Sequence, residues 1–140
     1  MKYVVSILVI SAVMFGLQCG SSTHSVAEKE AVAAAVAWLQ LIDSANYSQS
    51  WDKCAEFFQS AIDKPDWIKA MAITRKPLGK LLSRKLESAK YSDSLPGAPD
   101  GEYVVIQFQT EFENKKNTLE TVTPLKEVDG QWRVSGYYIK

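Results

Sequence analysis

Residues 102–113 constrain the fold of this chain most, because side-chain polarity alternates along them. Apolar or hydroxyl side chains occupy one face, at Val104, Ile106, Phe108, Thr110 and Phe112. The other face carries amides and carboxylates, at Gln107, Gln109, Glu111 and Glu113. A period of two predicts a strand with one face in a core and the other in water. Tyr103 and Val105 interrupt the polar face, so we expect that end to be covered on both sides, by a helix or a neighbouring subunit.

Turn-forming residues bracket this strand. A tight loop is predicted before it, from Pro96, Gly97, Pro99 and Gly101. A polar turn follows at residues 114–117, and the alternation then resumes at Leu119, Thr121, Thr123 and Leu125. Pro124 has no backbone N–H to donate to a neighbouring strand, so we expect it at an edge, a bulge or an unpaired position.

Asp129–Gly130 predicts a two-residue hairpin near the end of the chain. Pairing outward from this turn places Leu125 opposite Val134 and Thr123 opposite Gly136. In this register the apolar residues of the preceding strand share one face with Trp132, Val134 and Tyr138. The agreement between turn and pattern supports a real hairpin.

Two helices are predicted from the first part of the chain. Ser25 and Glu28 have the spacing of a capping box, so the first helix should begin there and end near Asp43. Its apolar stripe is formed by Val32, Ala35, Val36, Leu39 and Ile42. A second helix is predicted over residues 47–62, with Asn46 as its candidate cap. Its inward side would carry Trp51, Cys54, Phe58, Ala61 and Ile62.

Asp63 can cap a third helix, in which Pro65 is tolerated in the first turn. We expect its inward residues to be Trp67, Ile68, Met71 and Ala72. Lys76–Pro77 and Gly79 should end it. Residues 80–92 suit either a helix, through their leucines, or an exposed strand, through their alternation, and periodicity alone does not decide; we favour the strand.

These elements predict an α+β domain over residues 26–140, with three N-terminal helices packed on an antiparallel sheet of about four strands. The chain has 140 residues and 46% hydrophobic content, which is enough for one packed core. Its formal net charge of zero gives no general attraction to nucleic acid, so nucleic acid is not an expected partner.

The N-terminus predicts export. Lys2 precedes an apolar run over residues 3–17, which is short for a bilayer span and typical of a cleaved signal. Cys19 then precedes a small polar segment, residues 20–25. This arrangement resembles a bacterial lipoprotein signal, in which the cysteine is lipidated, although Gly16 and Gln18 depart from the usual lipobox. We expect a lipid-anchored protein of the bacterial cell envelope, facing the periplasm or the exterior; simple secretion and a permanent membrane anchor are the alternatives.

The chain has two cysteines. If Cys19 carries lipid, Cys54 is expected to be a small buried apolar residue on a helix. If Cys19 is unmodified and retained, an oxidising compartment would allow a disulfide between the two. Neither case predicts a metal site.

Several motifs resemble those of the bacterial domain-of-unknown-function 4019 family, which comprises small exported proteins. The likeness spans about residues 32–140 and lies in Ser50–Trp51, the Trp67 helix, Arg75–Gly79, Ser83–Arg84, Leu95–Phe108, Glu120–Pro124 and Asp129–Tyr138. It implies helices that precede a curved sheet of the cystatin-like or nuclear-transport-factor-like type, with residues 80–92 as a strand. It implies no chemistry for any residue.

Catalytic motifs do not occur in the sequence. The single histidine, His24, falls in the expected tether, where a solvated role is favoured. Fold-level analogy allows one enzymatic alternative, a small cavity enzyme that uses a carboxylate with tyrosines in the helix–sheet cleft. The residues weighed for it are Asp43, Asp52, Asp66, Tyr47, Tyr103, Tyr137 and Tyr138. Helix caps, solvated acids and packed tyrosines are the favoured interpretation.

A non-enzymatic binding or protein-interaction domain is the leading functional hypothesis. Aromatic side chains dominate binding energies, and the candidate binding residues are Trp51, Trp67, Tyr103, Trp132 and Tyr137. At these spacings, packing in the core is the commoner role. The partner would be an unknown protein or a small ligand, with a homodimer through the sheet as a further expectation, and no cofactor or metal is predicted. A local basic stretch, at Arg75, Lys76, Lys80, Arg84 and Lys85, is more typical of a solvated face than of a binding site.

Overall fold

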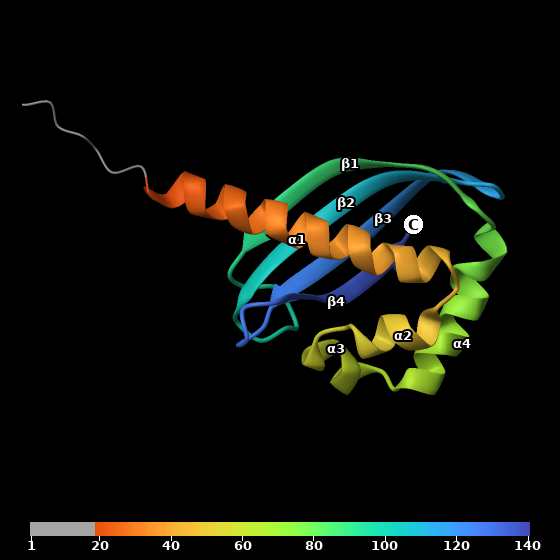
Figure 1. Ribbon diagram of the computed structural model, residues 1–140, viewed down its shortest axis with the longest axis horizontal. Coiled ribbons are helices and arrows are strands. Elements are labelled where there is room, and N and C mark those ends of the chain that lie inside the picture. The colour runs from red at the N-terminus through yellow and green to blue at the C-terminus, as the bar shows by residue number, and fades with distance from the viewer. Residues whose placement is uncertain (1–18) are drawn as a thin grey trace, which may run out of the picture.

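The computed structural model describes residues 19–140, with side chains from residue 23 onward. The predicted signal peptide spans residues 1–19, and its residues 1–18, including Lys2, Gly16 and Gln18, lie outside this range, as does the side chain of Cys19. Four α-helices and a short 3₁₀-helix precede four strands in the described chain (Figure 1). The helices are α1 (Cys19–Asp43), α2 (Tyr47–Asp52), α3 (Glu56–Ala61), α4 (Lys64–Thr74) and η1 (Lys76–Leu78). The strands are β1 (Leu81–Ser92), β2 (Glu102–Phe112), β3 (Lys115–Lys126) and β4 (Trp132–Ile139).

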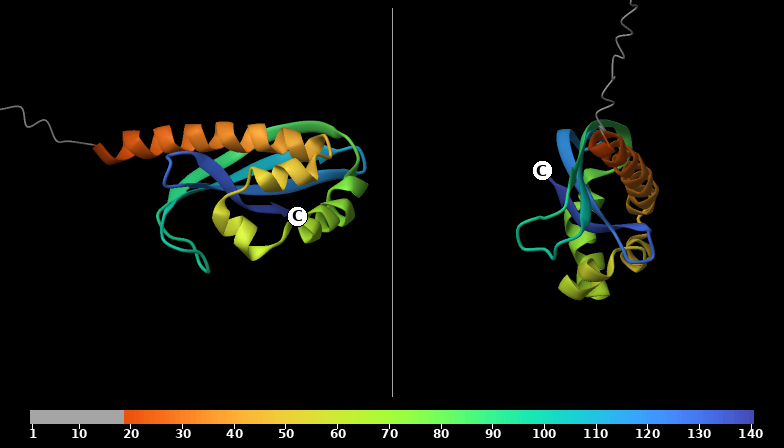
Figure 2. Two further views of the ribbon diagram at one scale, coloured as in Figure 1. Left: turned by 60° about the horizontal axis from the view of Figure 1, so that its bottom comes forward. Right: turned by 90° about the vertical axis from the view of Figure 1, so that its left-hand side faces the viewer.

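The four strands form one antiparallel sheet in the order β1-β2-β3-β4. The long helix α1 lies along one face of this curved sheet, and α2, α3 and α4 continue beside it (Figures 1 and 2). Sequential antiparallel neighbours need only short turns, which is the connection that the sequence provides. The predicted α+β class, with helices N-terminal to the sheet, is confirmed.

The predictions for β2 are confirmed in detail. Its inward residues are almost entirely buried, with Val104, Ile106, Thr110 and Phe112 at 0% exposure. Tyr103 is also buried, and in the described chain a loop covers it, not the helix that was one of the expectations. Its hydroxyl donates to the carbonyl oxygen of Pro99 at 2.6 Å, because the loop between β1 and β2 folds onto the face of the sheet opposite α1 (Figure 2).

The start of α1 differs from the prediction. From Cys19, the first residue that the structure describes, the helix runs through residues 20–25, which were expected to form a tether. The expected capping box is wrong, because the carboxylate of Glu28 accepts a hydrogen bond from the backbone N–H of Tyr91 at 3.1 Å. The ring of His24 stacks on Tyr91 with centroids 4.2 Å apart, so this histidine is not a free tail residue. On the predicted inward face of α1, Ala35, Leu39 and Ile42 are buried as expected, whereas Val36 is 42% exposed.

The predicted second helix is two helices. Between α2 and α3 the backbone N–H of Ala55 donates to the carbonyl oxygen of Val134 at 2.8 Å, and Cys54 forms a parallel bridge with the same residue. In a continuous helix this N–H would have donated to a carbonyl oxygen of the preceding turn, whereas here it donates to β4. Cys54 is buried and free, as expected, but it lies in this break and not on a helix.

Helix α4 begins as predicted. The side chain of Asp63 accepts the backbone N–H of Asp66 at 2.9 Å, and a proline follows in the first turn. Trp67 and Met71 are buried, whereas Ile68 is exposed, as is Ala72. Asn46 precedes α2 but its side chain makes no capping bond. Residues 81–92 form a strand, as favoured.

The core face of β3 is the opposite of the predicted one. Its buried residues are Thr118, Glu120, Val122 and Pro124, and the expected set at Leu119, Thr121, Thr123 and Leu125 is only half-buried. A register irregularity at the turn between β2 and β3, where Phe112 pairs with Lys115, shifts the phase by one residue. A one-residue shift moves every side chain to the other face.

The last hairpin exists, but its loop is longer than predicted. The backbone N–H of Glu127 donates to the carbonyl oxygen of Gln131 at 2.9 Å, so three residues close the turn, with Gly130 at φ +81°. Thr123 lies opposite Gly136 as predicted, whereas Leu125 lies opposite Arg133. A bulge beside Pro124 causes this difference.

The same bulge reverses the alternation of β4. Consequently Tyr137 packs against the core, and Tyr138 is 70% exposed. The predicted inward position of Tyr138 is therefore wrong, while Val134 is buried as expected.

Candidate functional site

Aromatic side chains fill the cleft between helices and sheet. Trp38 makes an edge contact with Tyr137, with ring centroids 5.2 Å apart, and Trp67 makes one with Phe58 at 5.0 Å. Both indole N–H groups are satisfied by one residue of α2. Trp38 donates to the carbonyl oxygen of Ser50 and Trp67 to its hydroxyl, each at 2.9 Å. The cleft is therefore closed by packed rings whose polar atoms have partners.

An ionic network lies deeper in the same cleft. Two guanidinium nitrogens of Arg84, on β1, donate to the carboxylate of Asp43 at 2.7 and 3.0 Å. Its Nε donates to Glu120, on β3, at 2.8 Å. Burial alone would lower the pKa of Arg84, but the hydrogen bonds to Asp43 and Glu120 raise it above its ordinary value. Arg84 is thus a permanent cation that ties the end of α1 to two strands.

Arg75 provides a second cation for Asp43. One guanidinium nitrogen donates to Asp43 at 3.1 Å and another to the carbonyl oxygen of Gly79 at 2.8 Å. The group also lies over the ring of Phe112, 4.3 Å from its centroid. Asp43 is the last residue of α1, where the helix dipole disfavours a negative charge, and the two arginines offset that cost.

Glu120 is the residue in this network that the sequence did not predict. It is fully buried, and its carboxylate accepts bonds from Arg84, from the hydroxyl of Thr110 at 2.6 Å and from the hydroxyl of Tyr137. Burial, followed by the charge of Glu120, raises the pKa of Tyr137 well above its usual range. The phenol is therefore a neutral donor near neutral pH and cannot serve as a base.

The residues weighed for catalysis do not meet in one place. Asp43 and Tyr137 belong to the network, although Arg84 and Glu120 lie between them. Asp52 pairs with Lys64 at 2.7 Å on the surface, and Asp66 is exposed in the first turn of α4. Tyr47 is buried at the start of α2, near enough to the network for the charges of Arg75 and Asp43 to act on its pKa, which burial raises. Tyr103 and Tyr138 are separate, since Tyr103 is under its loop and Tyr138 faces outward. One carboxylate and one tyrosine do meet, Glu120 and Tyr137, but this carboxylate also accepts hydrogen bonds from Arg84 and Thr110.

A groove lies beside β4 at the rim of this cleft. Its cavity of about 410 Å³ has no charged residue in its lining. The helices α3 and α4 and the segment between them contribute Phe58, Ile62, Trp67, Ala70, Met71 and Thr74, and β4 contributes Tyr137, Tyr138 and Ile139. The side chains of Tyr137 and Tyr138 point to opposite faces of the sheet. A cavity bordered by both residues is bordered by the edge of the strand itself.

Of the five candidate binding aromatics, Trp67 and Tyr137 share this groove. Trp132 borders a separate cavity of about 420 Å³ between α1, α2 and the start of β4, and its indole donates to Glu30 at 3.2 Å. Trp51 donates to the carbonyl oxygen of Ile62 at 2.9 Å, and Tyr103 is held under its loop. The structure thus separates the predicted set into four places.

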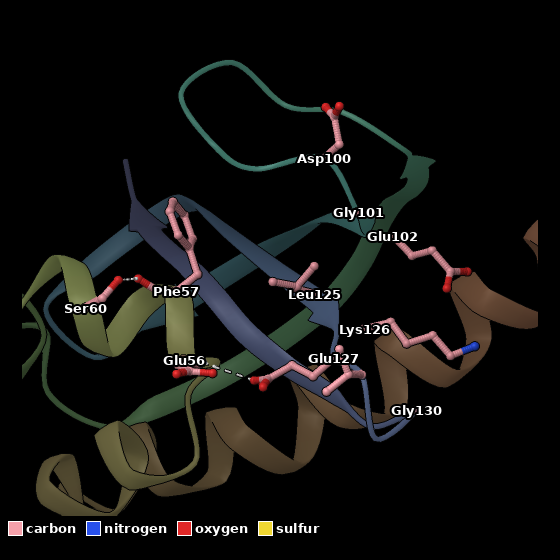
Figure 3. A pocket seen from close by; sticks show the side chains of 11 residues that line it. Glu56, Phe57, Ser60, Asp100, Gly101, Glu102, Leu125, Lys126, Glu127 and Gly130 are labelled. Carbon is pink, nitrogen blue, oxygen red and sulfur yellow. Dashed lines mark hydrogen bonds between the residues drawn. The ribbon is translucent and has the colours of Figure 1, made fainter.

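A wide depression of about 850 Å³ lies on the other side of β3, between α3 and two loops (Figure 3). Its walls carry carboxylates around a central Leu125, at Glu56, Asp100, Glu102 and Glu127. These side chains point in different directions, and Glu127 accepts the backbone N–H of Glu56 at 3.2 Å (Figure 3). Within residues 23–140 no cluster of acids, histidines or cysteines is arranged to hold a metal ion.

The basic stretch does not form a single face. Arg75 and Arg84 turn inward to the network, whereas Lys76, Lys80 and Lys85 are exposed. Among the described helices, none combines the length and apolar character that crossing a membrane requires.

Comparison with known proteins gives one result about the family. None of the curated proteins and none of the solved structures matches the chain. A family model described as "Protein of unknown function (DUF4019)" matches residues 34–137, which include the last part of α1, the helices α2, α3, α4 and η1, the strands β1, β2 and β3, and most of β4. The chain therefore belongs to the DUF4019 family.

Proposed function

We propose that this protein is a lipid-anchored, non-enzymatic binding domain of the bacterial cell envelope, which holds its partner in the groove beside β4. The observation that carries the proposal is the contrast between two regions. The helix–sheet cleft, where related architectures place catalytic groups, is filled by Trp38, Trp67 and the network around Glu120. The groove offers uncharged aromatic and aliphatic surface to solvent, which is what a binding site uses.

The position of Cys19 supports the anchor. It lies at the N-terminal end of the described part of α1, whose 25 residues would extend about 37 Å. The groove lies toward the opposite end of the molecule, near α4 (Figure 1). Acyl chains on Cys19 would supply the membrane affinity, because the chain has no net charge to do so. The groove would then face away from the bilayer.

Intact-mass measurement of protein purified from its native membrane tests the anchor. We expect a mature chain that begins at Cys19 and carries the added mass of acyl groups. It should enter the detergent phase, and the Cys19→Ser variant should lose membrane association while keeping its melting temperature. A soluble native species that begins beyond Cys19 and carries no lipid would overturn the anchored location.

A small cavity enzyme is the second candidate, favoured by the hydrogen bond that Tyr137, a residue of the groove lining, donates to the buried carboxylate of Glu120. This candidate ranks below binding because the carboxylate of Glu120 already accepts hydrogen bonds from Arg84, Thr110 and Tyr137. Catalysis would require the hydrogen bond between Glu120 and Tyr137 to break. A native phenol at Tyr137 that titrates near neutral pH would favour this second candidate.

A further inference from the structure

The outer edge of β4 presents backbone groups to the groove. Leu119 and Lys140 exchange both backbone hydrogen bonds, at 3.1 and 2.9 Å. Such pairs alternate along an antiparallel ladder with pairs that exchange none. Ile139 and Tyr137 lie one and three residues before Lys140, so both are out of phase with it along the ladder. Their N–H and C=O groups therefore point away from β3, toward the open edge of the sheet.

The first half of the same edge is already extended by the chain. Ala55 donates its backbone N–H to the carbonyl oxygen of Val134, and Cys54 forms a parallel bridge there. The chain then turns away into α3. The bridge reaches only Val134, so within residues 19–140 the sheet has no strand beyond the end of β4.

The groove has the shape that an added strand requires. One wall is the edge of β4, and the other is the apolar side of α3 and α4, with Phe58, Trp67 and Met71. Alternate side chains of an added strand would enter the groove, and the others would lie beside the exposed ring of Tyr138. The lining has no charged residue, so a charged side chain entering the groove would find no partner.

We propose that the groove binds an extended polypeptide segment of a partner protein, which pairs with β4 as a fifth strand and places an uncharged, apolar residue in the groove at every second position. This inference rests on the proposed binding function and names the class of its partner. Main-chain pairing explains why the site combines an open strand edge with an apolar wall, since backbone bonds give affinity and alternate pockets give specificity. Residues 136–139 offer room for about four paired residues.

A displayed library of random linear nonapeptides, screened against the soluble Cys19→Ser protein, is the first test. We expect the enriched peptides to carry apolar residues at alternate positions and no charge among them. One enriched peptide is then synthesised in two N-methylated forms, with the methyl groups on either of its two edges. Methylation of the edge that faces β4 should weaken binding at least tenfold, and methylation of the other edge should leave it unchanged.

Matched variants of the protein locate the contact. Ile139→Pro removes an N–H that points away from β3, so it costs no bond of the sheet, and we expect it to weaken peptide binding at least tenfold. Ile139→Ala keeps that N–H and should weaken binding less. Thermal melting of both variants checks that the fold is retained. Protection of the Tyr137 and Ile139 amides against hydrogen exchange, measured with the unmodified protein, gives a second readout.

Three results would overturn the inference. Equal affinity of both N-methylated peptides would show that the backbone edge is not used. Binding of a small apolar dye in the groove without peptide binding would leave the binding function intact and remove the peptide as its partner. Self-association through β4, seen as a dimer that Ile139→Pro abolishes, would assign the edge to a second copy of this chain.

Discussion

Glu120 is the residue on which the interior depends most. It is fully buried and accepts bonds from a guanidinium and two hydroxyls. A buried ion pair adds little net stability when formed, but removal of one member leaves the other charge without a partner. The network is therefore sensitive to single changes.

Replacement of Glu120 by alanine should destabilise the protein by about 3–5 kcal/mol, because Arg84 and the hydroxyls of Thr110 and Tyr137 lose their acceptor. Urea unfolding measures the change. Glu120→Gln keeps an acceptor and should cost less. Glu87→Ala, on the exposed part of β1, is the control and should stay within about 0.5 kcal/mol of wild type. A similar loss in both alanine variants would contradict the network.

Alkaline pH should reveal the state of Tyr137. Because its folded pKa is raised, the protein keeps a proton that the unfolded chain releases. The corresponding stability is complete below the unfolded pKa of about 10 and is lost as pH rises above it. Between about pH 9 and about pH 11, wild type should lose more stability than Tyr137→Phe. Equal losses would mean that the phenol is not held by Glu120.

The sequence predicted several buried residues correctly but missed Glu120. Trp67, Met71 and the inward residues of β2 follow patterns that one element contains. Glu120 is polar, and its burial depends on the phase of β3, which the irregular turn after Phe112 decides. The signal lies in the alternation of Thr118, Val122 and Pro124, which competes with an equally regular set one residue away.

Among the elements, the turn at Gly130 gives the sharpest local test. Its φ of +81° suits glycine, and a Cβ there would meet no atom within 4 Å, so only backbone strain opposes substitution. Gly130→Val should cost about 1–3 kcal/mol. Gly130→Asn, which tolerates this conformation, should cost less. Equal melting temperatures for the two variants would show that the turn relaxes.

The break between α2 and α3 places Cys54 against β4, and its thiol reports whether the interior is closed. It is 3% exposed, and burial raises its pKa to about 12. In the Cys19→Ser protein it is the only thiol, and we expect it to react with a disulfide reagent only where urea unfolds the chain. Rapid reaction of the native protein would contradict a filled cleft.

Some predictions that depend on a single element were correct, and the continuous helix, which depends on a contact with another element, was wrong. Asp63 and Pro65 set the start of α4 from local chemistry, and β2 follows its own alternation. The continuous helix predicted over residues 47–62 failed because Val134, far along the chain, takes the backbone bond of Ala55. The helix propensity of residues 47–62 contains no information about a hydrogen-bond acceptor that is distant in the sequence.

At the scale of the whole molecule, the fold class followed from element order, since helices that precede antiparallel strands pack on one face. The groove beside β4 could not be predicted from the order of the elements. Trp67 and Tyr137 were both candidates, but their meeting depends on the bulge in β4 that turns Tyr137 inward. The described part of the chain has a long axis, with the start of α1 at one end and α4, which lines the groove, toward the other (Figure 1).

Position-specific photo-crosslinking in the cells that make the protein tests the central claim, that partners meet the groove and not another surface. Benzoylphenylalanine would replace Tyr138 at the groove, Asp100 at the wide depression or Glu87 on β1, one position at a time. We expect a discrete adduct from position 138 alone, and we expect it to be lost when Ile139→Pro is added. Adducts from position 100 or 87 with none from position 138 would contradict it.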